Sequence, residues 1–136
     1  MITAELIERL RQAVDDHDLD ALTACFAPDF CNETPAHPGR GFAGRNQVRA
    51  NWARIFSGIP DIRASVLRTA VDGDVACTEW EMGGRRADGV PQTLRGVIIF
   101  GVAGEHLSWC RFYLEPVDTG EEGVEAAIGR IAEAGQ

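Results

Sequence analysis

The chain has 136 residues, which is enough for one domain with a substantial core. Its formal net charge of −8 disfavours a nucleic-acid backbone or an anionic membrane as a partner. No apolar run approaches the roughly 20 residues that span a bilayer, and no secretory leader precedes the first predicted helix, so we expect a cytoplasmic protein. The cysteines lack the close spacing of a zinc site, so we expect no metal and buried, reduced thiols at Cys25, Cys31, Cys77 and Cys110.

The first half of the chain predicts three helices. Apolar residues at helical spacing follow Thr3, which can cap the first helix. A second, short helix follows Asp18 and ends at Pro28, and a third runs from about Asn46 to Gly58. Between the second and third helices, residues 30–34 read as a short strand and residues 36–44 as a loop.

The second half predicts a sheet of four antiparallel strands over residues 62–71, 75–82, 92–102 and 106–115. Asp72-Gly73 is a strong hairpin signal between the first two. A final helix is expected from residue 121 to 134. Helices that precede most of the strands indicate an α+β fold, with three N-terminal helices packed on one face of a curved, mainly antiparallel sheet. We expect one domain over residues 1–136, with its core in 2–116 and a helical tail in 119–135.

Strand alternation divides the sheet into two faces. One face is nearly all apolar and should be covered by the helices, which leaves a conical cavity between them as the natural ligand site. Neighbouring helix and loop residues should close it. The predicted pocket residues are Leu10, Asn32, Thr34, Trp52, Thr78, Trp80, Met82, Cys110, Phe112 and Leu114.

The other face mixes charges with aromatic residues. Registers set by the two turns would place Glu79, Arg95 and Tyr113 side by side, with Trp109 and Arg111 nearby. This row could form a catalytic site. We favour a homodimer interface, because an open sheet face offers no cleft that excludes water and because arginine and aromatic residues are enriched at interfaces.

Several short runs are typical of one family. Their order along the chain is Asp18-Leu19-Asp20-Ala21-Leu22, Phe26-Ala27-Pro28-Asp29-Phe30, Ile59-Pro60-Asp61, Gly73-Asp74-Val75, Thr78-Glu79-Trp80 and Arg111-Phe112-Tyr113-Leu114-Glu115. Over residues 2–116 the chain resembles the SnoaL-like branch of the nuclear-transport-factor-2-like superfamily. The resemblance implies a cone-shaped α+β barrel, a deep apolar pocket and a homodimer built on the outer sheet face. It does not imply one activity, because the fold carries isomerases, cyclases, hydrolases and non-enzymes.

The catalytic positions of the known relatives hold other residue types in this chain. The resemblance implies that the base of a ketosteroid isomerase would stand at Thr34 and its tyrosine donor at Leu10. The aspartate of the SnoaL-like cyclases would stand at Phe112. The arginine and aspartate of the limonene-epoxide-hydrolase-like enzymes would fall at Trp80 and Met82. None of these side chains can abstract a proton at neutral pH, so those mechanisms are not expected.

Two readings of function therefore remain, with a third beside them. The first is a binding protein for a hydrophobic, polycyclic or terpenoid-like molecule, with no cofactor. The second is an enzyme of the cyclase, isomerase or dehydratase type that uses His37, Asn32 or Glu79; the last would require a bulge that turns it inward. The third is an interaction module whose sheet face is its whole function and whose cavity would be filled. We expect no nucleic-acid or membrane partner.

Overall fold

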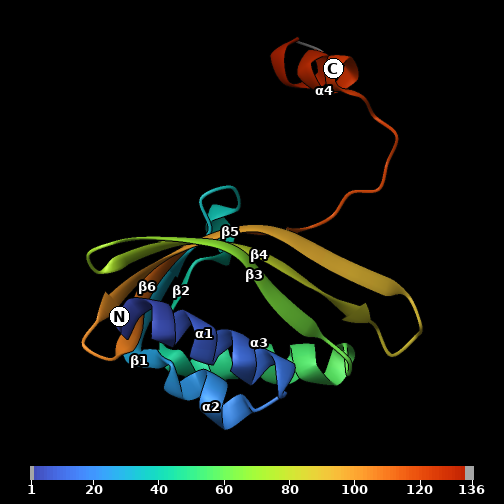
Figure 1. Cartoon of the computed structure of the whole chain (residues 1–136). Helices are drawn as coiled ribbons and strands as arrows, with labels where there is room; N and C mark the ends of the chain where they lie inside the picture. The colour runs from blue at the N-terminus through green and yellow to red at the C-terminus, as the bar shows by residue number, and fades with distance from the viewer. Residues whose placement is uncertain (1, 134–136) are drawn as a thin grey trace.

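The computed structural model describes residues 2–133 (Figure 1). The helices are α1 (Ile2–Asp15), α2 (Leu19–Ala24), α3 (Arg45–Gly58) and α4 (Val124–Ala132), with one 3-10 turn, η1 (Pro38–Arg40). The strands are β1 (Phe26–Glu33), β2 (Phe42–Ala43), β3 (Arg63–Asp72), β4 (Val75–Arg85), β5 (Pro91–Ala103) and β6 (His106–Pro116).

The strands form one six-stranded sheet in the order β2-β1-β6-β5-β4-β3. All neighbours are antiparallel except β1 and β6, which run parallel. Helices α1, α2 and α3 lie on one face of the curved sheet, and the sheet is not closed (Figure 1). The α+β prediction is confirmed, as is the expected C-terminal helix. The parallel pairing was not predicted, and it brings the first strand against the last.

Helix α1 is fastened to the sheet at its C-terminal end by Asp15. This carboxylate accepts a hydrogen bond from the backbone N–H of Ala64 at 2.7 Å and from Arg11 at 2.8 Å, and Arg63 lies 3.4 Å away. Burial raises the pKa of Asp15, but these partners outweigh it and hold the pKa below its ordinary value. These contacts therefore fix the position of α1 against β3, and α1 forms one wall of the space between the helices and the sheet.

The start of β1 differs from the prediction. Helix α2 ends at Ala24, and β1 begins at Phe26, ahead of Pro28, which was expected to end the helix. The carbonyl of Cys25 accepts a hydrogen bond from the N–H of Leu107 at 2.8 Å, and Phe26 then pairs with Leu107. Long-range pairing with β6 therefore overrides the local helical pattern, a preference that no short window of sequence contains.

The register of the outer face is shifted from the prediction. Strand β4 runs on to Arg85, so Glu79 pairs with Val97, and Arg95 pairs with Glu81 instead. Tyr113 lies opposite Val97, not Arg95. The predicted row of Glu79, Arg95 and Tyr113 is therefore wrong. A second cause is the irregularity of β6, where Trp109 pairs with Gly101 but Leu107 pairs with Val102, which leaves Ser108 as an extra residue.

Two of the four cysteines contradict the expected burial. Cys25 and Cys110 are buried, but Cys31 and Cys77 are exposed. In β1 and β4 these two residues alternate with buried neighbours, so their thiols emerge on the face that lacks helices. An apolar run does not bury every residue when only one face of the sheet is covered.

Helix α4 stands away from the rest of the chain (Figure 1). Its predicted apolar stripe is present but uncovered, since Val124, Ile128 and Ile131 are 73%, 56% and 76% exposed. The preceding residues 117–123 form no helix or strand. A helix of nine residues gains little stability from its own hydrogen bonds in water, so packing partners decide how well α4 is populated.

Candidate functional site

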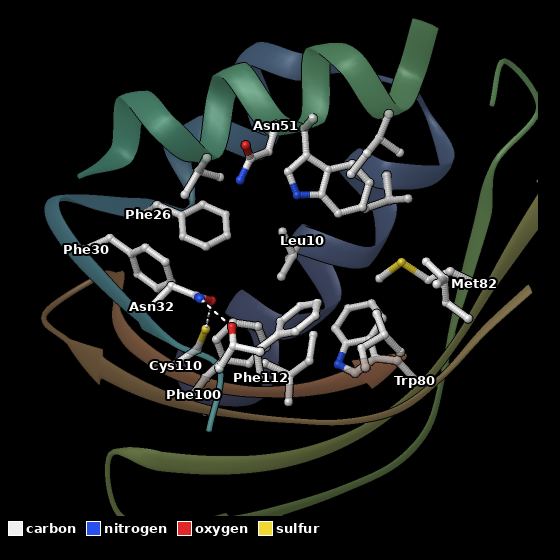
Figure 2. Close-up of a pocket in the computed structure, with 18 of the residues that line it drawn as sticks. Leu10, Phe26, Phe30, Asn32, Asn51, Trp80, Met82, Phe100, Cys110 and Phe112 are labelled. Atoms are coloured by element: carbon white, nitrogen blue, oxygen red, sulfur yellow. Dashed lines mark hydrogen bonds between the residues drawn. The ribbon is translucent and has the colours of Figure 1, made fainter. Parts of the chain in front are cut away.

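A cavity of about 280 Å³ lies between the sheet and the helices α1 and α3 (Figure 2). This volume stands at the low end of the usual range for ligand pockets. Its walls are mainly aliphatic and aromatic. The side chains that line it include Leu10 and Val14 from α1, Phe26 and Phe30 from β1, Val48, Trp52, Ile55 and Ile59 around α3, and Trp80, Met82, Leu94, Ile98, Phe100, Phe112 and Leu114 from the strands.

Three polar side chains meet at one end of the cavity. The amide nitrogen of Asn32 donates to the Thr34 hydroxyl at 3.0 Å, and the thiol of Cys110 donates to the amide oxygen of Asn32 at 2.9 Å (Figure 2). Asn32 and Thr34 alternate on the inward side of the chain at the end of β1, and Cys110 pairs with Asn32 across the parallel ladder. All three are buried, so the strand pairing itself assembles this polar end.

Helix α3 contributes the remaining polar groups of the wall. Asn51 lines the cavity, and Figure 2 shows its amide nitrogen turned towards the interior. Its oxygen accepts a hydrogen bond from Gln47, one turn earlier, at 2.8 Å. Trp52 follows directly and packs on Phe56, with ring centroids 5.5 Å apart. The helix therefore presents one amide and one indole to the same space.

Thr78 does not line the cavity, although it was predicted to do so. Its hydroxyl donates to the carbonyl of Ile98 at 2.6 Å and accepts from the indole N–H of Trp80 at 2.6 Å. Trp80 has no solvent-exposed surface and is itself part of the cavity wall. Thr78 therefore fixes the orientation of a wall residue. The other nine predicted pocket residues line the cavity.

The candidate catalytic residues are not brought together. Asn32 lies in the cavity, but His37 is absent from its lining and lies 3.0 Å from Glu115. Arg40, which does reach the lining, is 3.7 Å from the same carboxylate. Glu79 lies on the opposite face of the sheet, 3.8 Å from Arg68. The pairing of β4 with β5 is regular through Glu79, and the register shift opposite it lies in β3, between Val66 and Arg68. The sequence hypothesis that a bulge turns Glu79 into the cavity is therefore wrong.

Few groups in the cavity can exchange a proton near neutral pH. No carboxylate and no imidazole lines it among residues 2–133. Burial raises the pKa of the Cys110 thiol to about 12, so this sulfur stays protonated. Within the same part of the chain, no group of three metal-binding side chains occurs, and no helix is long and apolar enough to cross a membrane.

The residues of the predicted dimer face lie on the side of the sheet away from the helices. Trp109 and Tyr113 are 36% and 38% exposed, which is high for large aromatic side chains. The indole of Trp109 lies against Gly101, where a β-carbon would come within 2.0 Å of the ring, so only glycine fits there. Charged pairs surround the two aromatics, with Arg95 2.8 Å from Glu81 and Arg111 3.0 Å from Glu33.

Sequence reasoning missed Asn51 and Arg40. The signal for Asn51 was present, because it lies three residues after Val48 and one turn before Ile55, on the same side of α3. A polar residue inside an apolar helical stripe is a reason to suspect a role in a site. Arg40 lies within the loop of residues 36–44, which has no periodicity, so no pattern in the sequence predicts its position.

Comparison with known proteins gives the family. The family model of the SnoaL-like domain matches residues 7–109 of the chain. No curated protein sequence matches. Among solved structures, a hypothetical protein with a ketosteroid isomerase-like fold from Catenulispora acidiphila, crystallised with trimethylamine, has a TM-score of 0.70 at 21% identity, covering 82% of this chain and 86% of that one.

Two further structures carry the names of enzymes. IdmH, a candidate polyketide cyclase from Streptomyces antibioticus, has a TM-score of 0.72 at 20% identity, over 82% of this chain and 91% of its own. An LEH-like epoxide hydrolase from M. tuberculosis has a TM-score of 0.72 at 16% identity, over 84% of this chain and 83% of its own. Identities this low establish a common fold and no common activity. The chain belongs to the SnoaL-like domain family.

Proposed function

We propose that this protein binds a small, mostly apolar molecule in its cavity and performs no acid–base chemistry on it. The observation that carries the proposal is the lining itself. The lining encloses an unfilled cavity of about 280 Å³ and holds no carboxylate or imidazole among the described residues. A filled cavity would instead have favoured a pure interaction module.

Affinity would come from burial of apolar surface. Each buried methylene contributes about 0.8 kcal/mol, so a ligand with about ten buried carbons gains about 8 kcal/mol before the costs of ordering. A binding free energy of about 8 kcal/mol corresponds to a dissociation constant of about 1 μM. We therefore expect micromolar affinity or weaker for simple bicyclic compounds, and tighter binding only where polar contacts add to it.

The enzyme alternative draws on the names of neighbours with the same fold. An acid–base mechanism needs a group within reach of the ligand that exchanges a proton near pH 7. His37 comes within reach of a ligand only if it leaves Glu115, 3.0 Å away, and turns towards the cavity. For this reason we place binding first and test for turnover directly.

The test uses N-phenyl-1-naphthylamine, a neutral dye that fluoresces when it enters an apolar site. Val48→Phe adds bulk to the cavity wall, because Val48 is 4% exposed and lines it. Val90→Phe makes the same change on an exposed loop, 45% exposed, and serves as the matched control. We expect saturable binding that weakens about tenfold in Val48→Phe and is unchanged in Val90→Phe.

Absence of saturable binding, or equal binding by both variants, would overturn the proposal. Compounds that displace the dye are then incubated with the protein and analysed by mass spectrometry. Unchanged compounds are expected. Conversion that disappears in His37→Ala would replace the binding reading with the enzyme reading.

A further inference from the structure

The polar end of the cavity holds unused hydrogen-bond donors. Each amide nitrogen carries two N–H groups and each hydroxyl carries one O–H. Asn32 donates one N–H to the Thr34 hydroxyl, and its amide oxygen accepts a hydrogen bond from the Cys110 thiol. The oxygen of Thr34 serves as an acceptor in that contact, and nothing in residues 2–133 accepts its own hydroxyl hydrogen. One N–H of Asn32 and the O–H of Thr34 are therefore left over.

Helix α3 adds donors from the other wall. The oxygen of Asn51 is occupied by Gln47, but its amide nitrogen faces the cavity and makes no hydrogen bond within the described chain (Figure 2). The indole N–H of Trp52 also has no acceptor there. Both of these residues line the same space as Asn32 and Thr34. The unused capacity on both walls therefore consists mainly of donors.

The donors of Asn32 and Thr34 are shielded from bulk solvent, whereas Asn51 and Trp52 are half-buried. Asn32 is 7% exposed and Thr34 is 4% exposed. A buried donor without a partner is costly, and water in an unliganded cavity can satisfy it until a ligand oxygen takes its place. A ligand that brings an acceptor to this end gains hydrogen bonds, whereas a hydrocarbon of the same shape displaces the water and leaves the donors unpaired.

We infer that the ligand is a neutral apolar molecule with a carbonyl-type oxygen, a ketone or ester, that accepts hydrogen bonds from Thr34 and Asn51. This inference rests on the proposed binding function. An amine is disfavoured because no anionic side chain lines the cavity among residues 2–133. A carboxylate is disfavoured because Arg40, the one lining cation in the described part of the chain, is 61% exposed and already lies 3.7 Å from Glu115.

The experiment compares three bicyclic compounds of nearly equal size as competitors of N-phenyl-1-naphthylamine. Tetralin has no acceptor, 1-tetralone has a carbonyl oxygen, and 1-aminotetralin is a cation that only donates. We expect 1-tetralone to bind the wild-type protein about 3- to 10-fold more tightly than tetralin, the range that one net hydrogen bond supplies. The amine should bind more weakly than tetralin.

Variants then assign the preference to particular groups. Asn51→Leu removes one donor and should lower the ratio of tetralone to tetralin affinity, whereas Asn46→Leu, on the exposed side of the same helix, should not change it. Thr34→Val should also lower the ratio, and Thr34→Ser, which keeps the hydroxyl, should preserve it. Thr34→Val also removes the acceptor of Asn32, so its thermal unfolding is measured alongside.

The outcomes separate the two proposals. If the dye binds and Val48→Phe weakens it, but tetralin and 1-tetralone compete equally or not at all, the donor inference is wrong and the binding function stands. A tetralone preference that survives in both Asn51→Leu and Thr34→Val would also overturn the inference. If the dye does not bind, the proposed function fails, and the inference fails with it.

Discussion

The buried contact between Thr78 and Trp80 can be tested by removing one hydroxyl. Thr78→Val keeps the shape of the side chain and removes the group that joins the Trp80 indole to the carbonyl of Ile98, each at 2.6 Å. Both Thr78 and Trp80 have 0% exposure, so water cannot reach the orphaned N–H without a rearrangement of the core.

The expected loss follows from that burial. A buried donor left without a partner costs about 1–3 kcal/mol, and the carbonyl of Ile98 loses one of its contacts as well. The extra methyl group of valine recovers part of this loss. We expect Thr78→Val to lower the free energy of unfolding by about 2 kcal/mol, a large fraction of the marginal stability of a domain this size.

Urea unfolding at one fixed protein concentration measures the change through the midpoint at constant slope. Thr69→Val is the matched control, because Thr69 pairs with Thr78 across β3 and β4 but is exposed. It should shift the free energy of unfolding by less than about 0.5 kcal/mol. Trp80→Phe provides the second arm of a double-mutant cycle, since it removes the indole donor itself.

In the cycle, Thr78→Val should cost less in the Trp80→Phe background than in the wild type, because no N–H is left unpaired there. Additive effects of the two substitutions would refute the reasoning. So would a loss in Thr78→Val no larger than the loss in Thr69→Val. In either case the indole hydrogen bond would not be what holds this part of the cavity wall.

Three further outcomes are expected. Asp15→Asn should lower the free energy of unfolding by about 1–3 kcal/mol at pH 7. The difference from the wild type should shrink as the pH falls through the folded pKa of Asp15, which lies below the ordinary 3.8, because the wild-type carboxylate then loses the charge that its partners stabilise. A difference that persists in acid would contradict this. Without denaturant, thiol reagents should label Cys31 and Cys77 well before the two buried cysteines, and equal rates for all four would show that the core is open. Trp109→Glu should weaken a homodimer formed through the outer sheet face, as followed by analytical ultracentrifugation, and a wild type that sediments as a monomer at high concentration would rule out that dimer.

The fold follows from the sequence where one covered face enforces strict alternation. Ala76, Trp80 and Met82 in β4 are buried, while Cys77 between them is exposed, which is the pattern that period two predicts. The same rule fails in β6, where Leu107 and Cys110, three residues apart, are both buried. The irregularity at Ser108 resets the alternation, and its cause lies in pairing with β5, which no single strand reveals.

The candidate site was predictable in its apolar part and less so in its polar part. Phe112 and Leu114 lie where alternation put them. Asn32 and Cys110, however, form a hydrogen bond only because β1 pairs in parallel with β6, and hairpin signals carry no information about a pairing between distant segments. The sequence places Asn51 within the apolar stripe of α3, but a single polar residue in such a stripe does not reveal what it faces.

The parallel pairing of β1 with β6 also determines when the cavity exists during folding. The strands β3 to β6 join neighbours along the chain, so their hairpins can form early, but Asn32 meets Cys110 only after the two ends of the domain come together. During synthesis the pairing of β1 with β6 must wait for the last strand to leave the ribosome, and Phe26 has no strand partner until then. A ligand that requires this polar end can bind only the completed domain, and its binding reports the final step of folding.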